Sequence, residues 1–245
     1  PLYSSAASDV YKRQFQEYSK RARLDVAKKQ AEELIAYLKE AKGVEKIEAA
    51  GSLRRRLETI GDIDILVTGK NAEAAMEKFV SYPKVREVLS KGETKSSVVL
   101  ESGIQADVRF FEPKNFGAGL QYFTGSKAHN IAVRTIAKQM GLKISEYGVF
   151  RGEKLVAGRT EEDVYKVLGL PYLPPEIRED RGEIQAAKQG KLPELIELKD
   201  VRGDLQVHSD WTDGRNPILE MAERAKNFGY QYLSLIHISE PTRPY

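Results

Sequence analysis

The chain has 245 residues, and its 39 Lys and Arg residues against 36 Asp and Glu residues leave a formal net charge of +3. This length suits one or two ordinary domains, and so small a surplus neither requires nor excludes a polyanionic partner. The absence of cysteine excludes disulfides and thiolate metal sites. No apolar run reaches the length of a membrane span and no secretory leader opens the chain, so we expect a cytoplasmic protein without a membrane partner.

The two ends of the chain are related at the level of codons. A short segment near the start reads DVYKRQ and one near the end reads LSLIHI. A nucleotide sequence that encodes the first has a reverse complement that encodes the second, as happens when a sequencing adapter is translated together with an insert. We therefore expect residues 1–14 and 233–245 to be non-native and leave them out of the fold prediction. This exclusion leaves His129 and His208 as the histidines available for chemistry.

Helical spacing and alternation of apolar residues mix helices with strands along the first half of the chain. The expected elements are helices over residues 24–42 and 72–80 and strands over 44–50, 62–67, 97–100 and 104–111, the last two forming a hairpin. In the second half we expect a helix over 126–140, a hairpin over 144–156 that turns at 151–154, and a short helix opened by a capping box at 160–163. The break at Leu173-Pro174-Pro175 predicts a domain boundary.

Two acids in the predicted strand 62–67 point to a metal site. Asp62 and Asp64 are two residues apart, so both carboxylates project from one face of the strand. Like charges that point the same way repel, and a divalent cation between them removes the conflict. Asp107, which alternates with apolar residues in another predicted strand, is the candidate third ligand. Oxygen ligands without cysteine or clustered histidine favour Mg²⁺, with Mn²⁺ as a substitute, over zinc.

A candidate phosphate site precedes this acid pair. Gly51 and Ser52 come before an expected helix start, where free backbone N–H groups and a hydroxyl suit a phosphate. Three forked donors follow at Arg54, Arg55 and Arg56. Taken singly, an Asp-x-Asp strand is more often a solvated face, and an arginine triplet is usually an exposed surface. Their joint spacing favours nucleotidyl or phosphoryl transfer with two metal ions.

This arrangement resembles the palm of the family X DNA polymerases, the group of DNA polymerase beta. The residues that match are Gly51, Ser52, Arg54, Arg55, Asp62 and Asp64, with Asp107 and Arg109 on the later strand. The resemblance implies that the three aspartates are catalytic and bind two Mg²⁺ ions. It further implies that the glycine, the serine and Arg55 bind the phosphates of the incoming dNTP. Arg56 stands where a glycine is common in the family.

A second stretch, GLQYFTGSKAHN at residues 119–130, resembles the nucleotide-binding segment of the same family. Its expected nucleotide-binding residues are Tyr122, Phe123, Gly125 and Asn130. The resemblance implies that the aromatic pair contacts the sugar, that the glycine permits a sharp turn, and that the asparagine reaches the minor-groove edge of the base. Arg134 and Arg109 are expected to contact the template and DNA. By residue type alone, the aromatic pair would more often be core packing.

A third stretch, GDLQVHSDWTDG from Gly203, resembles the opening of the polymerase and histidinol phosphatase (PHP) domain that follows the polymerase in bacterial and archaeal members. That opening usually reads His-x-His, but Gln206 stands first here, so only His208 and Asp213 match. The residues that remain are too few for a barrel of roughly 200 residues or more. We therefore expect a truncated PHP domain. The family's amino-terminal DNA-binding domains would precede Phe15 and are likewise expected to be missing.

Together these resemblances imply an α+β fold: a nucleotidyltransferase palm with a mixed sheet, a small α+β subdomain and the start of a PHP barrel. The expected domains are the palm over residues 15–115, the nucleotide-binding subdomain over 116–175, a linker over 176–203 and the PHP start over 204–232.

The implied function is template-directed, gap-filling DNA synthesis in repair by a monomer that acts on gapped or primer-template DNA. It would add dNMP to a primer 3′-hydroxyl and release pyrophosphate. Two alternatives stay open. A template-independent nucleotidyltransferase would share the Gly-Ser and Asp-x-Asp core but lack the Tyr-Phe-Thr-Gly segment. A catalytically idle fragment would bind DNA, weakly at physiological salt, without extending a primer.

Overall fold

The computed structural model describes residues 21–236, and the chain divides into two compact units between Leu192 and Pro193. The expected non-native segment 1–14 lies outside the described residues. The first residues of the other such segment, 233–245, belong to a strand of the second unit, and its remainder from 237 lies outside the description. Among the described helices, none is both long and apolar enough for a membrane span.

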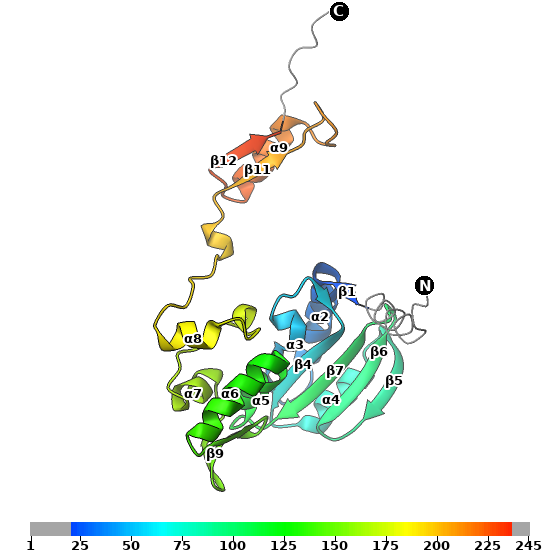
Figure 1. Ribbon diagram of the computed structural model, residues 1–245. Helices are drawn as coiled ribbons and strands as arrows, with labels where there is room; N and C mark the ends of the chain where they lie inside the picture. The colour runs from blue at the N-terminus through cyan, green and yellow to red at the C-terminus, as the bar shows by residue number, and fades with distance from the viewer. Residues whose placement is uncertain (1–20, 237–245) are drawn as a thin grey trace, which may run out of the picture. The chain divides into compact units, whose positions relative to one another are not determined.

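The first unit is built on a five-stranded sheet in the order β2-β4-β7-β6-β5 (Figure 1). Its strands are β2 (Val44–Ala49), β4 (Asp62–Gly69), β5 (Val85–Lys91), β6 (Lys95–Leu100) and β7 (Gln105–Phe111). β4 and β7 are parallel, whereas the other neighbouring strands are antiparallel. The expected α+β fold with a mixed sheet is therefore confirmed.

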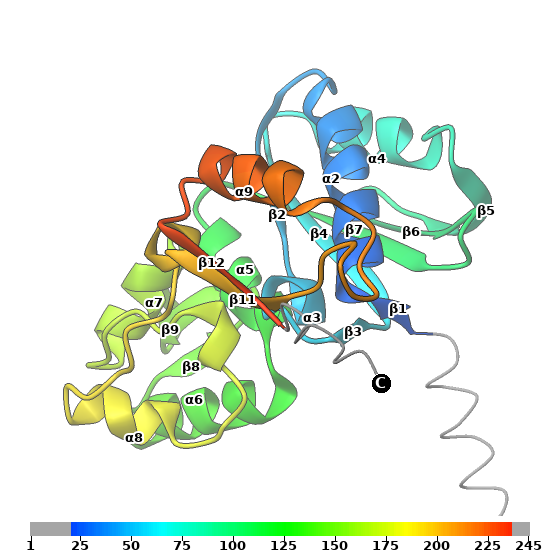
Figure 2. The same cartoon turned by 90° about the horizontal axis from the view of Figure 1, so that it is seen from above.

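Alternation along β4 gives the sheet two different faces. Ile63, Ile65 and Val67 are fully buried in the core beneath helices α2 (Leu24–Lys39) and α4 (Ala72–Val80), which lie side by side (Figure 2). Each such buried side chain contributes roughly 1.5–3 kcal/mol through removal of apolar surface from water. Because side chains alternate, the acids between them are directed to the opposite face. The order of residues in one strand thus fixes both the core and the candidate site.

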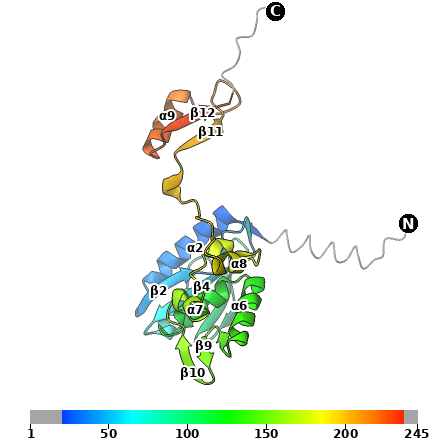
Figure 3. The same cartoon turned by 60° about the vertical axis from the view of Figure 1, so that its left-hand side comes forward.

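Residues 116–192 of this unit contribute a second core. This part contains helices α5 (Phe116–Thr124), α6 (Lys127–Gln139), α7 (Glu161–Val167) and α8 (Glu183–Lys188), and the antiparallel strands β8 (Lys143–Ser145), β9 (Gly148–Arg151) and β10 (Lys154–Ala157). Figure 3 shows α6, α7 and α8 together with β9 and β10. The hairpin expected to turn at 151–154 is confirmed, and β8 adds a third strand. The Thr160 hydroxyl accepts a hydrogen bond from the Asp163 N–H at 3.1 Å, so the predicted start of α7 is also confirmed.

Helix α5 and strand β5 of the first unit were not predicted, and neither were the two-residue strands β1 (Ala22–Arg23) and β3 (Thr59–Ile60). Helix α5 is apolar on nearly all sides, so it lacks the stripe by which an amphipathic helix is recognised. Its Gly117 packs on the backbone of Thr160, where a Cβ atom would overlap main-chain atoms. Strand β5 is an edge strand whose residues after Val85 are exposed, so it lacks a clear apolar alternation.

The expected linker over residues 176–203 is wrong at its amino-terminal end. A 3₁₀ turn, η1 (Pro175–Ile177), leads to Arg178, which is fully buried. Ile184 and Ala187 of α8 belong to the second core. The many charged residues of this segment concealed its burial, because several of those charges are paired inside the protein rather than solvated.

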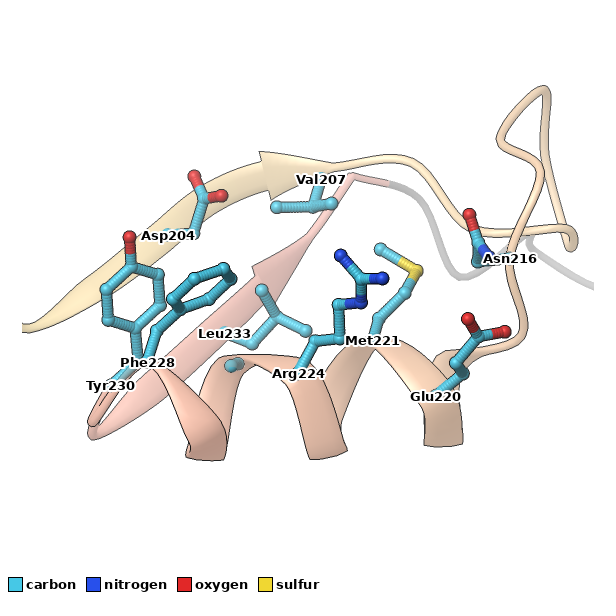
Figure 4. Close-up of a pocket in the computed structure, with 10 residues that line it drawn as sticks. Asp204, Val207, Asn216, Glu220, Met221, Arg224, Phe228, Tyr230 and Leu233 are labelled. Carbon is cyan, nitrogen blue, oxygen red and sulfur yellow. The ribbon is translucent and has the colours of Figure 1, made fainter. Parts of the chain in front are cut away.

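The second unit is a small β-α-β arrangement that follows the 3₁₀ turn η2 (Leu198–Asp200). Strand β11 (Gly203–Val207) pairs in parallel with β12 (Tyr232–Leu235), and α9 (Ile218–Asn227) connects them. Figure 4 shows Val207 and Leu233 of the strands opposite Met221 of the helix, around a cavity of about 340 Å³. Its identity as the start of a PHP domain stays a prediction.

Candidate active site

Three carboxylates from two adjacent strands converge on the face of the sheet opposite α2 and α4. Asp62 and Asp64 lie at the start of β4, and Asp107 lies on β7 as the register partner of Asp64. Oxygen atoms of all three lie within 4.8 Å of one another. The Gln105 amide donates to Asp107 Oδ1 at 3.1 Å, and Asp107 is only 9% exposed. The structure thus brings together the three acids that were predicted as metal ligands.

The electrostatics of this cluster favour a bound cation. Burial, followed by repulsion from Asp62 and Asp107, raises the pKa of Asp64 to about 7, while Arg109 and Arg55 oppose the shift. Burial and then Asp107 also raise the pKa of Asp62. A divalent ion between the carboxylates would relieve both the lost hydration and the repulsion. Because all three donors are hard oxygen atoms, the cluster fits Mg²⁺ or Mn²⁺.

The glycine of the Gly-Ser pair lies directly against this cluster. Gly51 begins the one-turn helix α3 (Gly51–Arg54) with a φ of +60°, a left-handed conformation that favours glycine. A Cβ atom at this position would overlap Asp64 Oδ2. The Ala50 N–H donates to the Asp64 carbonyl at 2.8 Å, which ties the loop to β4. Ser52, the second residue of α3, is half-buried.

The three arginines predicted as phosphate donors are used differently. Both Nη atoms of Arg54 bind Glu161, at 2.9 and 2.5 Å, and Nη1 also donates to Thr124 Oγ1 at 2.7 Å. Arg56 has a φ of +58° and pairs with Glu176 at 3.1 Å near the surface. The interpretation of the triplet as one set of phosphate donors is therefore wrong for Arg54, whose terminal fork is fixed inside the protein.

Arg55 connects the two predicted motifs. Its Nη1 donates to the Thr124 carbonyl at 2.5 Å, and its Nε donates to Glu179 at 2.6 Å. Gly125, which ends α5 with a φ of +69°, packs so closely that a Cβ atom would be 3.2 Å from Arg55 Nη1. The glycine turn predicted for the second motif thus lies against the arginine predicted for the first.

The aromatic pair at the end of α5 lies among the predicted DNA-contact arginines. The rings of Tyr122 and Phe123 meet edge to face at 5.0 Å. The Arg109 guanidinium lies 4.2 Å from the centre of the Phe123 ring, and that of Arg134 lies 5.4 Å from the Tyr122 ring. Arg109 also opposes the rise in the pKa of Asp64, so it lies near both the Phe123 ring and the carboxylates.

Asn130 supports this segment from α6. Its Nδ2 donates to the Tyr122 carbonyl at 2.7 Å, and its Oδ1 accepts from Gln121 at 2.8 Å. The side chain is largely buried. In this structure its observed partners are therefore protein groups that hold α5 beside α6.

A buried polar network around α6 was not predicted. His129 is fully buried, its Nδ1 is 2.7 Å from Glu183 Oε1, and its Nε2 is 2.9 Å from the Tyr165 hydroxyl. Burial lowers the pKa of His129, so the ring is neutral, with Nδ1–H donating to the carboxylate and Nε2 accepting from the hydroxyl. The histidine considered for chemistry is thus a structural residue. Its partners lie 54 and 36 residues away, beyond any local pattern.

The second unit contains the other histidine. His208 Nδ1 is hydrogen-bonded to the Asp213 carboxylate, which lowers the pKa of that acid. Between residues 21 and 236, the aspartate triad is the one group of three candidate ligands close enough to share an ion. A metal at His208 therefore stays a prediction without a third ligand in the described chain.

Comparisons with known proteins agree with this geometry. The family model described as DNA polymerase beta palm matches residues 23–120, and that described as DNA polymerase beta thumb matches residues 119–179. A crystal structure of Leishmania infantum polymerase beta, in a ternary P/T complex, has the same fold with a TM-score of 0.58 and 23% identity. That likeness covers 67% of this chain and 79% of the other.

Curated relatives extend the match. DNA polymerase/3′-5′ exonuclease PolX of Bacillus subtilis is 39% identical over 214 residues, which are 86% of this chain and 37% of that protein. Rat DNA polymerase lambda is 29% identical over 54% of this chain and 28% of its own length. Repair DNA polymerase X of African swine fever virus is also 29% identical, over 54% of this chain and 80% of its own length.

The fold and the carboxylate cluster define a palm domain of the polymerase beta type. The chain belongs to the family X DNA polymerases. It spans less than two-fifths of the bacterial and rat relatives that it matches.

Proposed function

We propose that this chain catalyses template-directed DNA synthesis of the kind that fills gaps during repair. It adds dNMP to a primer 3′-hydroxyl and releases pyrophosphate, acting as a monomer on gapped or primer-template DNA. The observation that carries the proposal is the convergence of Asp62, Asp64 and Asp107 beside Gly51. The turn at Gly125, which lies against Arg55, belongs to the same argument. The bacterial, rat and viral relatives are all named DNA polymerases, which supports the proposal.

The three aspartates would hold two Mg²⁺ ions, for which Mn²⁺ can substitute. When bound, such ions stabilise the negative charge of the transition state and lower the pKa of an attacking hydroxyl. The chain itself contributes the placement of the acids. Asp64 and Asp107 are register partners on parallel strands, so their spacing is fixed by backbone hydrogen bonds rather than by flexible loops.

The phosphates of the nucleotide would bind at the start of α3. Arg55 is cationic and fixed beside the Gly125 turn, so it is suited to neutralise charge on the leaving pyrophosphate. Ser52 adds a hydroxyl, and Gly51 allows a close approach because it has no side chain. Holding the phosphates next to the carboxylates aligns the reacting groups without a covalent intermediate.

The sugar and base would lie along the ends of α5 and α6. Tyr122 and Phe123 offer apolar faces to the sugar. Asn130 uses one amide hydrogen for the Tyr122 carbonyl, and the second would be donated to the minor-groove edge of the base. Arg134 would contact the template and Arg109 the DNA.

The test is extension of a labelled primer across a one-nucleotide gap at low salt. We expect the full chain with Mg²⁺ to insert the nucleotide complementary to the template, and Asp107→Asn to lower the rate by about a hundredfold or more. Asp25→Asn removes an exposed acid that pairs with Arg23 and should leave the rate unchanged.

Each alternative function predicts a different outcome of this primer-extension assay. Incorporation that ignores the template base would favour the template-independent nucleotidyltransferase. DNA binding without Mg²⁺-dependent extension at low salt would favour the idle fragment. An Asp107→Asn variant as fast as the wild type would refute the catalytic assignment.

A further inference from the structure

Arg55 is held by two acceptors that leave most of its donors unused. The Thr124 carbonyl binds Nη1 and Glu179 Oε1 binds Nε, while a guanidinium carries five N–H donors in all. The arginine side chain is 12% exposed and that of Glu179 is 24% exposed. An arginine otherwise loses much rotamer freedom when it binds a ligand. In this structure the two acceptors have already restricted it.

The neighbouring Arg54 differs from Arg55 because both of its terminal nitrogens already have a partner. Arg54 Nη1 and Nη2 donate to the two carboxylate oxygens of Glu161, so this end of the guanidinium is occupied. Glu179, by contrast, contacts Arg55 through a single oxygen on Nε. Because Nε lies at the base of the guanidinium, this contact orients the group while the Nη2 end stays available to another acceptor.

Glu179 is itself presented from a rigid segment. The preceding residue, Arg178, is fully buried and donates from Nη1 to Glu161 at 2.6 Å and from Nε to the Leu173 carbonyl at 2.8 Å. The Arg178 carbonyl accepts from the Ser126 N–H at 2.9 Å, at the start of α6. The carboxylate is therefore fixed with respect to both α3 and α6.

We propose that Glu179 is a positioning residue that orients the Arg55 guanidinium for the triphosphate of the incoming nucleotide. The inference rests on the proposed function, in which Arg55 binds phosphate. Glu179 itself does not touch the nucleotide. Its contribution is to lower the ordering cost of Arg55, and this contribution appears in nucleotide binding rather than in the chemical step.

The test uses single-nucleotide gap filling by the full chain. Glu179→Ala should raise KM for dNTP about threefold to tenfold, the factor expected from ordering one long side chain on binding, with kcat within about twofold. Glu179→Gln keeps an acceptor oxygen and should restore most of the wild-type KM. Thermal unfolding confirms that each variant is folded.

A matched control separates positioning from charge. Glu176 precedes Glu179 by three residues and pairs with Arg56 near the surface. Glu176→Ala removes the same charge from the same segment, so it should leave KM unchanged if orientation of Arg55 is what matters.

A double-variant cycle tests whether Glu179 acts through Arg55. In an Arg55→Ala background, the further change Glu179→Ala should leave KM unaltered, because residues that act through one contact are not additive. Equal effects of Glu179→Ala in both backgrounds would overturn the proposal. A KM that is unchanged or lower in Glu179→Ala alone would also overturn it, and a lower value would identify Glu179 as a competitor of the nucleotide.

Calorimetric binding of Mg²⁺–dTTP to the DNA-free chain distinguishes failure of the inference from failure of the proposed function. The weaker binding expected of Glu179→Ala, and its recovery in Glu179→Gln, do not require primer extension. If wild type and Glu179→Gln bind dTTP more tightly than Glu179→Ala but the wild type never extends a primer, the proposed polymerase function is refuted and the positioning role is supported. Equal binding by wild type and Glu179→Ala would overturn the positioning role.

Discussion

Glu161 is the shared carboxylate of a buried cluster that joins α3, α7 and the segment after η1. It is 5% exposed and binds both Nη atoms of Arg54 and, at 2.6 Å, Nη1 of Arg178. Burial alone would raise the pKa of Glu161, but the hydrogen bonds from Arg54 and the charge of Arg178 outweigh it and lower the pKa. Arg178 is fully buried over the rings of Tyr165 and Tyr172, so it depends on Glu161 for its counter-charge.

Glu161→Ala should therefore destabilise the first unit strongly. The change leaves two guanidinium groups, one of them fully buried, without their carboxylate. Removal of one partner from a buried ion pair costs about 3 to 5 kcal/mol. That is a large fraction of the roughly 5 to 15 kcal/mol by which domains are stable. Glu161→Gln keeps an acceptor oxygen but loses the charge. Its free energy of unfolding should therefore lie between that of Glu161→Ala and that of the wild type.

The assay is urea unfolding of the full chain, followed by far-ultraviolet circular dichroism. Trp211 is the single tryptophan and lies in the second unit, so its fluorescence serves as an internal reference that the substitution should not affect. Glu162→Ala, an exposed neighbour in the same turn of α7, should change the free energy of unfolding by less than about 0.5 kcal/mol.

The pH dependence gives a second criterion for Glu161. Because its pKa is lowered in the folded state, its contribution is present above its ordinary value of 4.5 and is lost as pH falls through the folded value. Wild type and Glu161→Ala should thus differ most near neutral pH and converge in acid. A difference below about 1 kcal/mol at neutral pH would contradict the assignment of Glu161 as the counter-charge of both arginines.

Two further predictions concern Gly51 and His129. Gly51→Ala places a Cβ atom on Asp64 Oδ2 in a left-handed backbone, so the rate of primer extension should fall about tenfold or more. The control is Gly141→Ala, which has a φ of +68° and open space for its Cβ atom, and it should retain the wild-type rate. Burial lowers the pKa of His129 from 6.5, so the unfolded chain binds more protons than the folded chain. Stability to urea should therefore fall as pH decreases below 6.5. His129→Asn should flatten this pH dependence, and an unchanged slope would contradict the role of the histidine.

The convergence of the three aspartates could be predicted because it depends on short, local sequence patterns. The alternation in β4 separates Ile63 and Ile65 from Asp62 and Asp64, because a period of two places the two pairs on opposite faces of the strand. Asp107 follows the same rule on β7. The helix over residues 72–80 was predicted with its observed limits, and in the structure the Asn71 side chain caps it by accepting a hydrogen bond from the Ala74 N–H.

The support of the site could not be predicted in the same way. Arg54 and Glu161 are separated by 107 residues, and Arg55 and Glu179 by 124. Local periodicity identifies neither partner, and a charged segment such as 176–183 is ordinarily solvated. The sequence therefore indicated which residues form the candidate site but not which residues hold them in place.

Arg54, the last residue of α3, and Arg55, the residue that caps it, bring two motifs that are distant in sequence together. Arg54 and Arg55 are adjacent, and both donate to Thr124, one to its hydroxyl and the other to its carbonyl. Thr124 ends α5 directly after Tyr122 and Phe123, so these bonds set the distance between α3 and the aromatic pair. Buried ion pairs contribute little net stability compared with apolar groups of the same shape, but they permit few alternative geometries. The cluster around Glu161 and Glu179 is therefore better suited to fix one placement of α3 against α5 than to increase stability. Loss of Glu161 would disturb folding and site geometry together, whereas loss of Glu179 would disturb the site alone.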